Sequence, residues 1–160
     1  ALPISNTTAV EQPVVQPDNS TKRLRIKRLY SEVSLPTRAH STDAGLDLVA
    51  TSHNRFEKYD EYGTGLAIAL PPGTVGLLFP RSSISNKDML LSNSVGVLDE
   101  NYRGEVKARF RRNVVLGESY KVGEKIIQLV VVPCLHPDVV EVESLEETDR
   151  NTGGWGSSGV

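Results

Sequence analysis

Apolar and polar side chains alternate most clearly in the stretch from residue 105 to residue 111. Val106, Ala108 and Phe110 fall on one face of this stretch, and charged residues fall on the other. This period of two predicts a strand that buries one face and exposes the other. Residues 126–132 are instead almost continuously apolar, which predicts a central strand.

Shorter apolar stretches predict further strands. Residues 66–70 and 75–79 flank a Pro-Pro-Gly turn, and this arrangement predicts a hairpin. Residues 139–143 predict one more strand near the end of the chain. Leu24 and Ile26 begin a strand-like pattern, so we expect the folded part to start near Leu24.

Glycine and proline recur so often that they leave little room for a long helix. Many short strands separated by turns are typical of a closed or two-sheet all-β fold. One short helix is expected after Pro80, with Ser82 or Ser83 as its N-terminal cap. The predicted fold class is therefore all-β with one short helix.

The composition changes at both ends of the chain. Residues 1–21 are rich in Pro, Ser, Thr, Asn and Gln and bury too little to offset their ordering entropy, so we expect a flexible N-terminal tail. Residues 22–145 are expected to form a β-barrel domain. Residues 146–160 are acidic at first and then place several glycines around the single Trp155, which predicts a separate glycine-rich arm.

Charge and cysteine usage narrow the class of protein. The chain has 160 residues, about one domain, and its 18 Lys+Arg against 20 Asp+Glu give a net charge of −2. This balance argues against a stable nucleic-acid partner, because such proteins usually carry a basic excess. The single Cys134 can form no intrachain disulfide, and we interpret it as a small buried side chain within an apolar strand.

No apolar stretch reaches the ~18 residues of a membrane span. The first residues also lack the basic start and apolar stretch of a secretory signal. These features predict an intracellular, soluble protein without a membrane partner, and they leave open whether it is cytoplasmic or nuclear.

Five clusters combine residue types that serve catalysis and binding. In the first, Asp43 and Asp47 flank Gly45; such acids can hold a hydrated Mg²⁺, although an Asp-rich turn is the commoner explanation. In the second, Arg81 precedes serines at the expected helix start. Backbone N–H groups and a guanidinium suit a phosphate there, and an ordinary capped helix with a surface Arg81 is the alternative.

The third cluster, residues 93–104, is the most informative. An apolar turn containing Gly96 ends in Asp99, and Tyr102 follows three residues later. The acid can take a proton from water, and the ring can stack on a base or press against a sugar. A tight hairpin with Tyr102 in the core is the alternative.

The fourth and fifth clusters lie near the end of the chain. Gln128 is one amide within an apolar strand, so it either ties the core together or contacts a ligand. Residues 150–159 carry Arg150 and Trp155 among glycines. Glycine permits a close approach to phosphates and Trp155 offers a stacking surface, which suits a lid; a frayed chain end is the alternative.

Taken together and in this order, the five clusters resemble the five motifs of the trimeric dUTPase family, with a match that runs from about Arg25 to Val160. The resemblance implies a jelly-roll-like β-barrel, a homotrimer with active sites between subunits, and a swapped C-terminal arm that closes a neighbour's site. It also implies Mg²⁺-dependent hydrolysis of dUTP to dUMP and pyrophosphate by water attack at the α-phosphate. Such an activity keeps uracil out of DNA and supplies dUMP for dTMP synthesis.

The resemblance also assigns roles to residues of this chain. Asp99 matches the base that activates water, Tyr102 the ring that excludes a 2′-hydroxyl, and Asp47 the acid near the hydrated Mg²⁺. The residues matched to uracil binding are Asn93, Gly96, Val97, Leu98 and Trp155, which covers the base. The residues matched to phosphate binding are Arg81, Ser82, Ser83, Gln128, Arg150, Gly156, Ser157 and Ser158. Ser83 stands where Gly is usual, and Trp155 replaces the more frequent Phe.

Three alternative interpretations can be compared with this one. A dCTP deaminase shares the superfamily, but it would need a deaminating site in place of the Asp99 and Tyr102 segment. A non-catalytic role, in which the nucleotide site acts as a switch for a regulatory protein partner, leaves no motif and stays open. A purely structural jelly roll does not explain why the charged and aromatic residues gather into five clusters.

Overall fold

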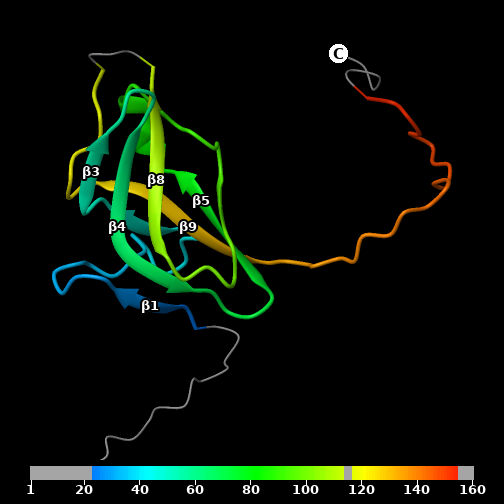
Figure 1. The fold of residues 1–160 in the computed structure, drawn as a ribbon, viewed down its shortest axis with the longest axis horizontal. Helices are drawn as coiled ribbons and strands as arrows, with labels where there is room; N and C mark the ends of the chain where they lie inside the picture. Colours follow the sequence, from blue (N-terminus) through cyan, green and yellow to red (C-terminus); the bar gives the residue numbers. More distant parts are fainter. Residues whose placement is uncertain (1–22, 114–116, 155–160) are drawn as a thin grey trace, which may run out of the picture.

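The computed structural model describes residues 23–113 and 117–154, and its strands form two antiparallel sheets (Figure 1). The first sheet has the order β1-β4-β8-β6, with β3 also paired to β4, and the second has the order β2-β9-β5-β7. The elements are β1 Arg25–Arg28, β2 Leu46–Val49, β3 Ser52–Arg55, β4 Asp60–Ala69, β5 Thr74–Pro80, the 3₁₀ helix η1 Ser82–Asn86, β6 Met89–Leu91, β7 Gly96–Leu98, β8 Glu105–Arg112 and β9 Lys125–Pro133.

The two strands with the clearest sequence patterns form as expected. In β8, Val106, Ala108 and Phe110 are buried while the charged residues between them are exposed or half-buried. β9 lies between β2 and β5, which makes it the central strand predicted from its continuous apolar stretch. The first strand also forms, and Ile26 of β1 packs against the core.

Both sheets contribute to one apolar core. Tyr62 of β4 and Phe110 of β8 belong to the same buried cluster as Ile127 and Leu129 of β9. Tyr120, from the connection between β8 and β9, joins this cluster with its ring centroid 5.3 Å from that of Phe110. The expected all-β, jelly-roll-like barrel is thereby confirmed.

The hairpin predicted around Pro71-Pro72-Gly73 is wrong. β4 pairs with strands of the first sheet and β5 with strands of the second, so the turn crosses between sheets. Distant segments fix it: the Gly73 N–H donates to Glu100 Oε2 at 2.9 Å, and the Gly73 carbonyl accepts from the Cys134 N–H at 2.9 Å. These contacts are invisible to a local pattern.

The short helix after Pro80 forms as the single 3₁₀ turn η1, but its expected serine cap is wrong. Arg81 occupies the N-cap position with extended backbone angles, and no side chain caps the helix. A turn of this length leaves few N–H groups in need of a capping oxygen. Ser82 and Ser83 lie inside the turn instead.

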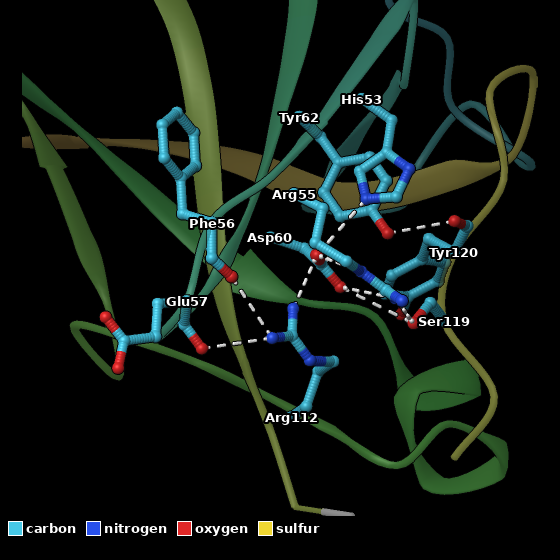
Figure 2. A network of polar contacts seen from close by, with 9 residues as sticks. All are labelled: His53, Arg55, Phe56, Glu57, Asp60, Tyr62, Arg112, Ser119 and Tyr120. Atoms are coloured by element: carbon cyan, nitrogen blue, oxygen red, sulfur yellow. Dashed lines mark hydrogen bonds and ion pairs between the residues drawn. The ribbon is translucent and has the colours of Figure 1, made fainter. Parts of the chain in front are cut away.

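A buried carboxylate organises one part of the first sheet (Figure 2). Asp60, at the start of β4, is fully buried and accepts hydrogen bonds from Arg112 Nη1 at 2.6 Å and Arg55 Nε at 3.1 Å. Arg112 also donates to the carbonyls of Phe56 and Glu57, both at 3.1 Å. The network therefore ties the β3–β4 connection to the end of β8.

Beyond β9, residues 134–154 leave the barrel as an exposed segment without regular structure (Figure 1). The strand expected at 139–143 is absent from this segment, where Val139 is 98% exposed. Cys134 follows the end of β9 and is half-buried, so its expected place inside a buried strand is also wrong. The N-terminal tail lies outside the described residues. Within the described ranges, no helix is both long and apolar enough to cross a membrane.

Candidate active site

The third cluster gathers around one pocket of about 680 Å³. The pocket lies against β7 and β8, and Ile127 of β9 also lines it. Every site residue expected in this cluster contributes to its walls, namely Asn93, Gly96, Val97, Leu98, Asp99 and Tyr102. A stretch of ten residues therefore supplies both the candidate acid and the candidate ring to one cavity.

The segment 93–98 contains the end of a turn and strand β7, and the turn connects two strands of different sheets rather than closing a paired hairpin. β6 pairs with β8 in the first sheet, and β7 pairs with β5 in the second. β7 is the edge of its sheet in the described part of the chain, so backbone groups on its outer side are free to meet a ligand. Ser94 in the turn has a φ of 62°, an uncommon conformation for a non-glycine residue that is often found at ligand sites.

Asp99 directly follows β7 and is exposed. Its backbone carbonyl accepts a hydrogen bond from the Tyr102 N–H at 3.1 Å, which closes a turn. Its carboxylate forms no hydrogen bond or ion pair with any other residue that the structure describes. Both oxygens can therefore accept a proton or a hydrogen bond from water in the pocket.

Tyr102 lies at the pocket and not in the core, since it is 45% exposed. Its hydroxyl donates to the Glu105 carbonyl at 3.1 Å, which directs the ring back along the chain. A Cβ at residue 104 would collide with the Tyr102 hydroxyl, so glycine is required at that position. The hairpin-core alternative for Tyr102 is excluded by this exposure.

The first, second and fourth clusters meet in a separate group of contacts. Arg81 Nε donates to Asp47 Oδ1 at 2.7 Å, and Lys125 Nζ lies 3.0 Å from Asp47 Oδ2. Gln128 pairs with Asp47 across β2 and β9, and its amide donates to the Pro80 carbonyl at 3.0 Å. We call Asp47, Arg81, Lys125 and Gln128 the Asp47 cluster.

The Asp47 cluster depends on a close approach of two strands. A Cβ at Gly45 would overlap with the side-chain oxygen of Gln128, so glycine there allows the amide to lie against the chain. The amide is half-buried and bonded to the residue that precedes Arg81. Gln128 thus fixes the backbone just before Arg81, which is a structural contact, and its contact with a ligand stays a prediction.

Opposing effects set the pKa of Asp47. Burial raises the pKa of this carboxyl, but hydrogen bonds and charges from Arg81 and Lys125 outweigh burial and hold it below its usual range. Asp47 is therefore an anion at neutral pH, and Arg81 is held close to it.

The donor set of the Asp47 cluster fits only one kind of metal site. The described residues contain no group of three or more His, Cys, Asp or Glu that could cage an ion. Mg²⁺ retains several waters and binds through few carboxylates plus substrate phosphates. The chemistry of the single carboxylate of Asp47 is compatible with such a hydrated ion through water, and this contact, which the family resemblance implies, stays a prediction.

The described part of the fifth cluster, residues 150–154, does not contribute to the pocket or to the Asp47 cluster. Arg150 is exposed in the segment beyond β9, and its Nε donates to the Gly153 carbonyl at 2.8 Å. Trp155, Gly156, Ser157 and Ser158 lie outside the described residues.

In the second cluster, Ser82 is exposed in η1, and its carbonyl accepts a hydrogen bond from the Ser85 hydroxyl at 2.9 Å.

Sequence reasoning missed two sets of charged residues. Lys125 contacts Asp47 because a bulge between Leu48 and Val49 shifts the register of β2 against β9, and no spacing signals a bulge. The second set lines the pocket: buried Glu61 lies 2.9 Å from Arg109 Nε and 3.2 Å from Lys107 Nζ.

Comparison with known proteins agrees with this geometry. The family model described as dUTPase matches residues 31–159. A curated relative from Rhodococcus erythropolis, named deoxyuridine 5'-triphosphate nucleotidohydrolase, is 44% identical over 140 residues and covers 85% of both chains. A relative of the same name from Corynebacterium jeikeium is 44% identical over 145 residues, which is 86% of this chain and 93% of the relative.

Solved structures agree as well. A mutant dUTPase of Staphylococcus bacteriophage 80alpha, solved with dUpNHpp, has a TM-score of 0.73 and 28% identity, covering 87% of this chain and 99% of that one. A mutant dUTPase from phage phi11 of S. aureus, described with a structural Mg(II) ion, has a TM-score of 0.66 and 25% identity, covering 78% and 99%. The chain therefore belongs to the dUTPase family of dUTP-hydrolysing enzymes.

Proposed function

We propose that this enzyme cleaves dUTP into dUMP and pyrophosphate, with Asp99 as the general base for water attack at the α-phosphorus. The observation that carries the proposal is the free carboxylate of Asp99 at the mouth of the pocket formed by residues 93–102. A general base needs an accessible, unpaired acceptor beside the reacting water. This product pair would remove dUTP from the precursors of DNA and provide dUMP for dTMP synthesis.

Uracil selection is assigned to the outer side of β7. A backbone acceptor facing N3–H and a donor facing O4 suit uracil, whereas cytosine presents the reverse pattern. The mismatch would leave buried polar groups unpaired, which can cost ~10⁴-fold in a site that reads polar groups. Asn93 supplies an amide at the same wall of the pocket, and the ring of Tyr102 would press against the deoxyribose and leave no space for a 2′-hydroxyl.

The triphosphate is assigned to the Asp47 cluster and the turn that follows β5. Arg81, Ser82 and Ser83 would face the phosphates, and Gln128 would lie near the α-phosphate. Arg81 is at present bonded to Asp47, so substrate binding would redirect its guanidinium to phosphate oxygens. A Mg²⁺ ion on the triphosphate, contacting Asp47 through water, would supply charge neutralisation.

A homotrimer accounts for the exposed segment beyond β9. Leu135 and Val139 are 90% and 98% exposed, and exposed apolar side chains along one segment favour burial against another subunit. The glycine-rich arm at 146–160 would then close a neighbour's site, with Arg150 and residues 156–158 on the phosphates and Trp155 over the uracil. Closure would exclude water other than the attacking one and would align it with the α-phosphorus.

Pyrophosphate release from a panel of dNTPs and UTP, with and without Mg²⁺, tests the proposal. We expect release from dUTP alone, dependent on the metal. Ammonia release from dCTP would instead identify a deaminase. Equal activity on UTP would contradict the role given to Tyr102.

A regulatory role is a second candidate function. A solved structure of the Staphylococcus bacteriophage 80alpha dUTPase with dUpNHpp matches this chain with a TM-score of 0.74 and 28% identity, and it is described with phage dUTPases that control transfer of virulence genes by a proto-oncogenic G protein-like mechanism. A nucleotide site closed by an arm could present different surfaces with and without dUTP. Capture of a protein partner that depends on dUpNHpp would support this role, and identical capture in both states would contradict it.

A further inference from the structure

The buried hydroxyl of Tyr120, close to the turn at residues 81–83 that we assign to the phosphates, has no hydrogen-bond partner among the described residues. Tyr120 is 3% exposed, and its Oη forms no hydrogen bond with any of the described residues. Buried hydroxyls in folded proteins are almost always paired. An unpaired one close to a turn that we assign to phosphates is a candidate to gain a partner when the ligand binds.

The Tyr120 ring is held rigidly from several sides. The Tyr62 hydroxyl donates to the Tyr120 carbonyl at 2.9 Å (Figure 2), and the rings of Tyr62 and Phe110 pack against it. The ammonium of Lys87 lies 5.3 Å from the ring centroid. Lys87 also ends η1, where its N–H donates to the Ile84 carbonyl. The ring is therefore fixed relative to the end of the turn that carries Ser83.

Ser83 is our candidate partner for the Tyr120 hydroxyl, because it lies in η1 and Lys87, which follows η1, packs against the Tyr120 ring. Burial raises the pKa of the Tyr120 phenol, and the Ser83 hydroxyl partly offsets this effect, although the Tyr120 hydroxyl forms no hydrogen bond with a described residue. Ser83 Oγ instead accepts a long hydrogen bond of 3.4 Å from Arg81 Nη1. The same guanidinium is bound to Asp47.

The direction of each hydrogen bond follows from the chemistry of the ligand. Phosphate oxygens only accept hydrogen bonds, so a serine hydroxyl that contacts them must donate its single proton. When Arg81 turns to the phosphates, Ser83 Oγ loses the donor that it has now. The phenol of Tyr120 keeps its proton at neutral pH, because burial raises its pKa, and it can donate to Ser83 Oγ. A hydroxyl that accepts one hydrogen bond becomes a stronger donor in the next.

We propose that Tyr120 is a positioning residue for the phosphate-binding turn: its phenol donates to Ser83 Oγ in the nucleotide complex, so that Ser83 donates to a phosphate oxygen. The inference rests on the proposed function, since it takes the turn at 81–83 as the triphosphate site. Tyr120 itself does not touch the substrate.

Tyr120→Phe, Ser83→Ala and the double variant test this role. The phenyl ring keeps the packing, so we expect the urea unfolding curve of Tyr120→Phe to match that of the wild type. We expect the Kd for dUpNHpp and the KM for dUTP to rise about fivefold, as for one lost neutral hydrogen bond. Because both residues act through one chain of hydrogen bonds, the double variant should be no weaker than Ser83→Ala alone. Tyr30→Phe, at an exposed tyrosine outside both groups of site residues, is the matched control.

The outcomes separate the two proposals. Unchanged dUpNHpp affinity in Tyr120→Phe, additive effects in the double variant, or a loss of affinity that accompanies a loss of stability would each overturn the positioning role while wild-type dUTP hydrolysis stands. If the wild type releases no pyrophosphate from dUTP and does not bind dUpNHpp, the proposed function fails and this inference fails with it.

Discussion

Asp60 and Asp99 are aspartates of one barrel in opposite surroundings. Asp60 is fully buried, and its carboxylate contacts Arg55, Arg112 and His53 at 3.1, 2.6 and 3.3 Å (Figure 2). Asp99 is exposed at a pocket and has no side-chain partner within the described part of the chain. The first carboxylate has its lone pairs occupied, whereas the second has them available for water.

This difference separates Asp60, which stabilises the fold, from Asp99, which can act as a base. Burial raises the pKa of Asp60, but its hydrogen bonds to Arg55 and His53, with the charge of Arg112, outweigh burial and lower it. A carboxylate stabilised in this way is a poor proton acceptor. Asp47 is intermediate, because its partner Arg81 belongs to the turn assigned to phosphates. The carboxylate with the most ion-pair partners is therefore not the catalytic candidate here.

The same substitution at the two aspartates should give opposite results, and the larger effect is expected at Asp99. Asp99→Asn removes the base without changing the size of the side chain. We expect kcat for dUTP to fall by ~10²-fold or more, while dUpNHpp binding and stability stay close to those of the wild type. Pyrophosphate release measures kcat, calorimetric titration measures dUpNHpp binding, and urea unfolding measures stability. Near-normal turnover would reject Asp99 as the base and remove one side of the comparison.

Asp60→Asn should instead act on stability. The substitution leaves Arg112, only 16% exposed, without its charge partner, and breaking such a pair costs about 3 kcal/mol. We expect the free energy of unfolding in urea to fall by about this amount, and kcat of the folded enzyme to remain unchanged. Asp138→Asn, at an exposed position, is the control. A large loss of kcat at unchanged stability would show that the buried network takes part in catalysis.

The C-terminal arm, residues 146–160, offers a third test of the contrast between residues that act in catalysis and residues that stabilise the barrel. Deletion of residues 151–160 should lower kcat/KM for dUTP by about tenfold or more, because closure positions the reacting groups. The free energy of unfolding should change little, since residues 134–154 lie outside both sheets and are mostly exposed. Trp155→Phe, which keeps an aromatic ring, should retain most activity. A fully active truncation would show that the Asp99 pocket works without the arm.

Much of the pocket could be predicted because its residues are contiguous in the sequence. Asp99 and Tyr102 are three residues apart, so one turn brings both to the same cavity. β8 and β9 could also be predicted from the sequence. The alternation in β8 indicates a strand with one buried face, and the continuous apolar stretch of β9 indicates a central strand. The five motifs then identified the family, although its arm residues from 155 onward stay predictions.

What the sequence could not provide depends on contacts between distant segments. The turn at 71–73 crosses between sheets because β4 and β5 find their partners far along the chain. The contact between Lys125 and Asp47 requires a bulge. An apolar stretch such as 139–143 indicates burial, yet none of the residues that the structure describes covers it. A sequence pattern indicates which face of a strand is apolar, but it does not indicate which segment or subunit packs against that face.

The smallest effect we expect is a difference in pH dependence between the two aspartates. A carboxyl whose folded-state pKa lies below its ordinary value adds stability above that value, and this contribution is lost as the pH falls through the folded-state pKa. For Asp60 the ordinary value is 3.8, so the free energy of unfolding should fall as the pH drops below about 4. Urea unfolding at a series of pH values should give a shallower fall in Asp60→Asn. Asp99→Asn, which removes no ion pair, should keep the wild-type slope. If both variants follow the wild-type curve, the ion pairs of Asp60 do not stabilise the fold, and burial alone would separate the two carboxylates.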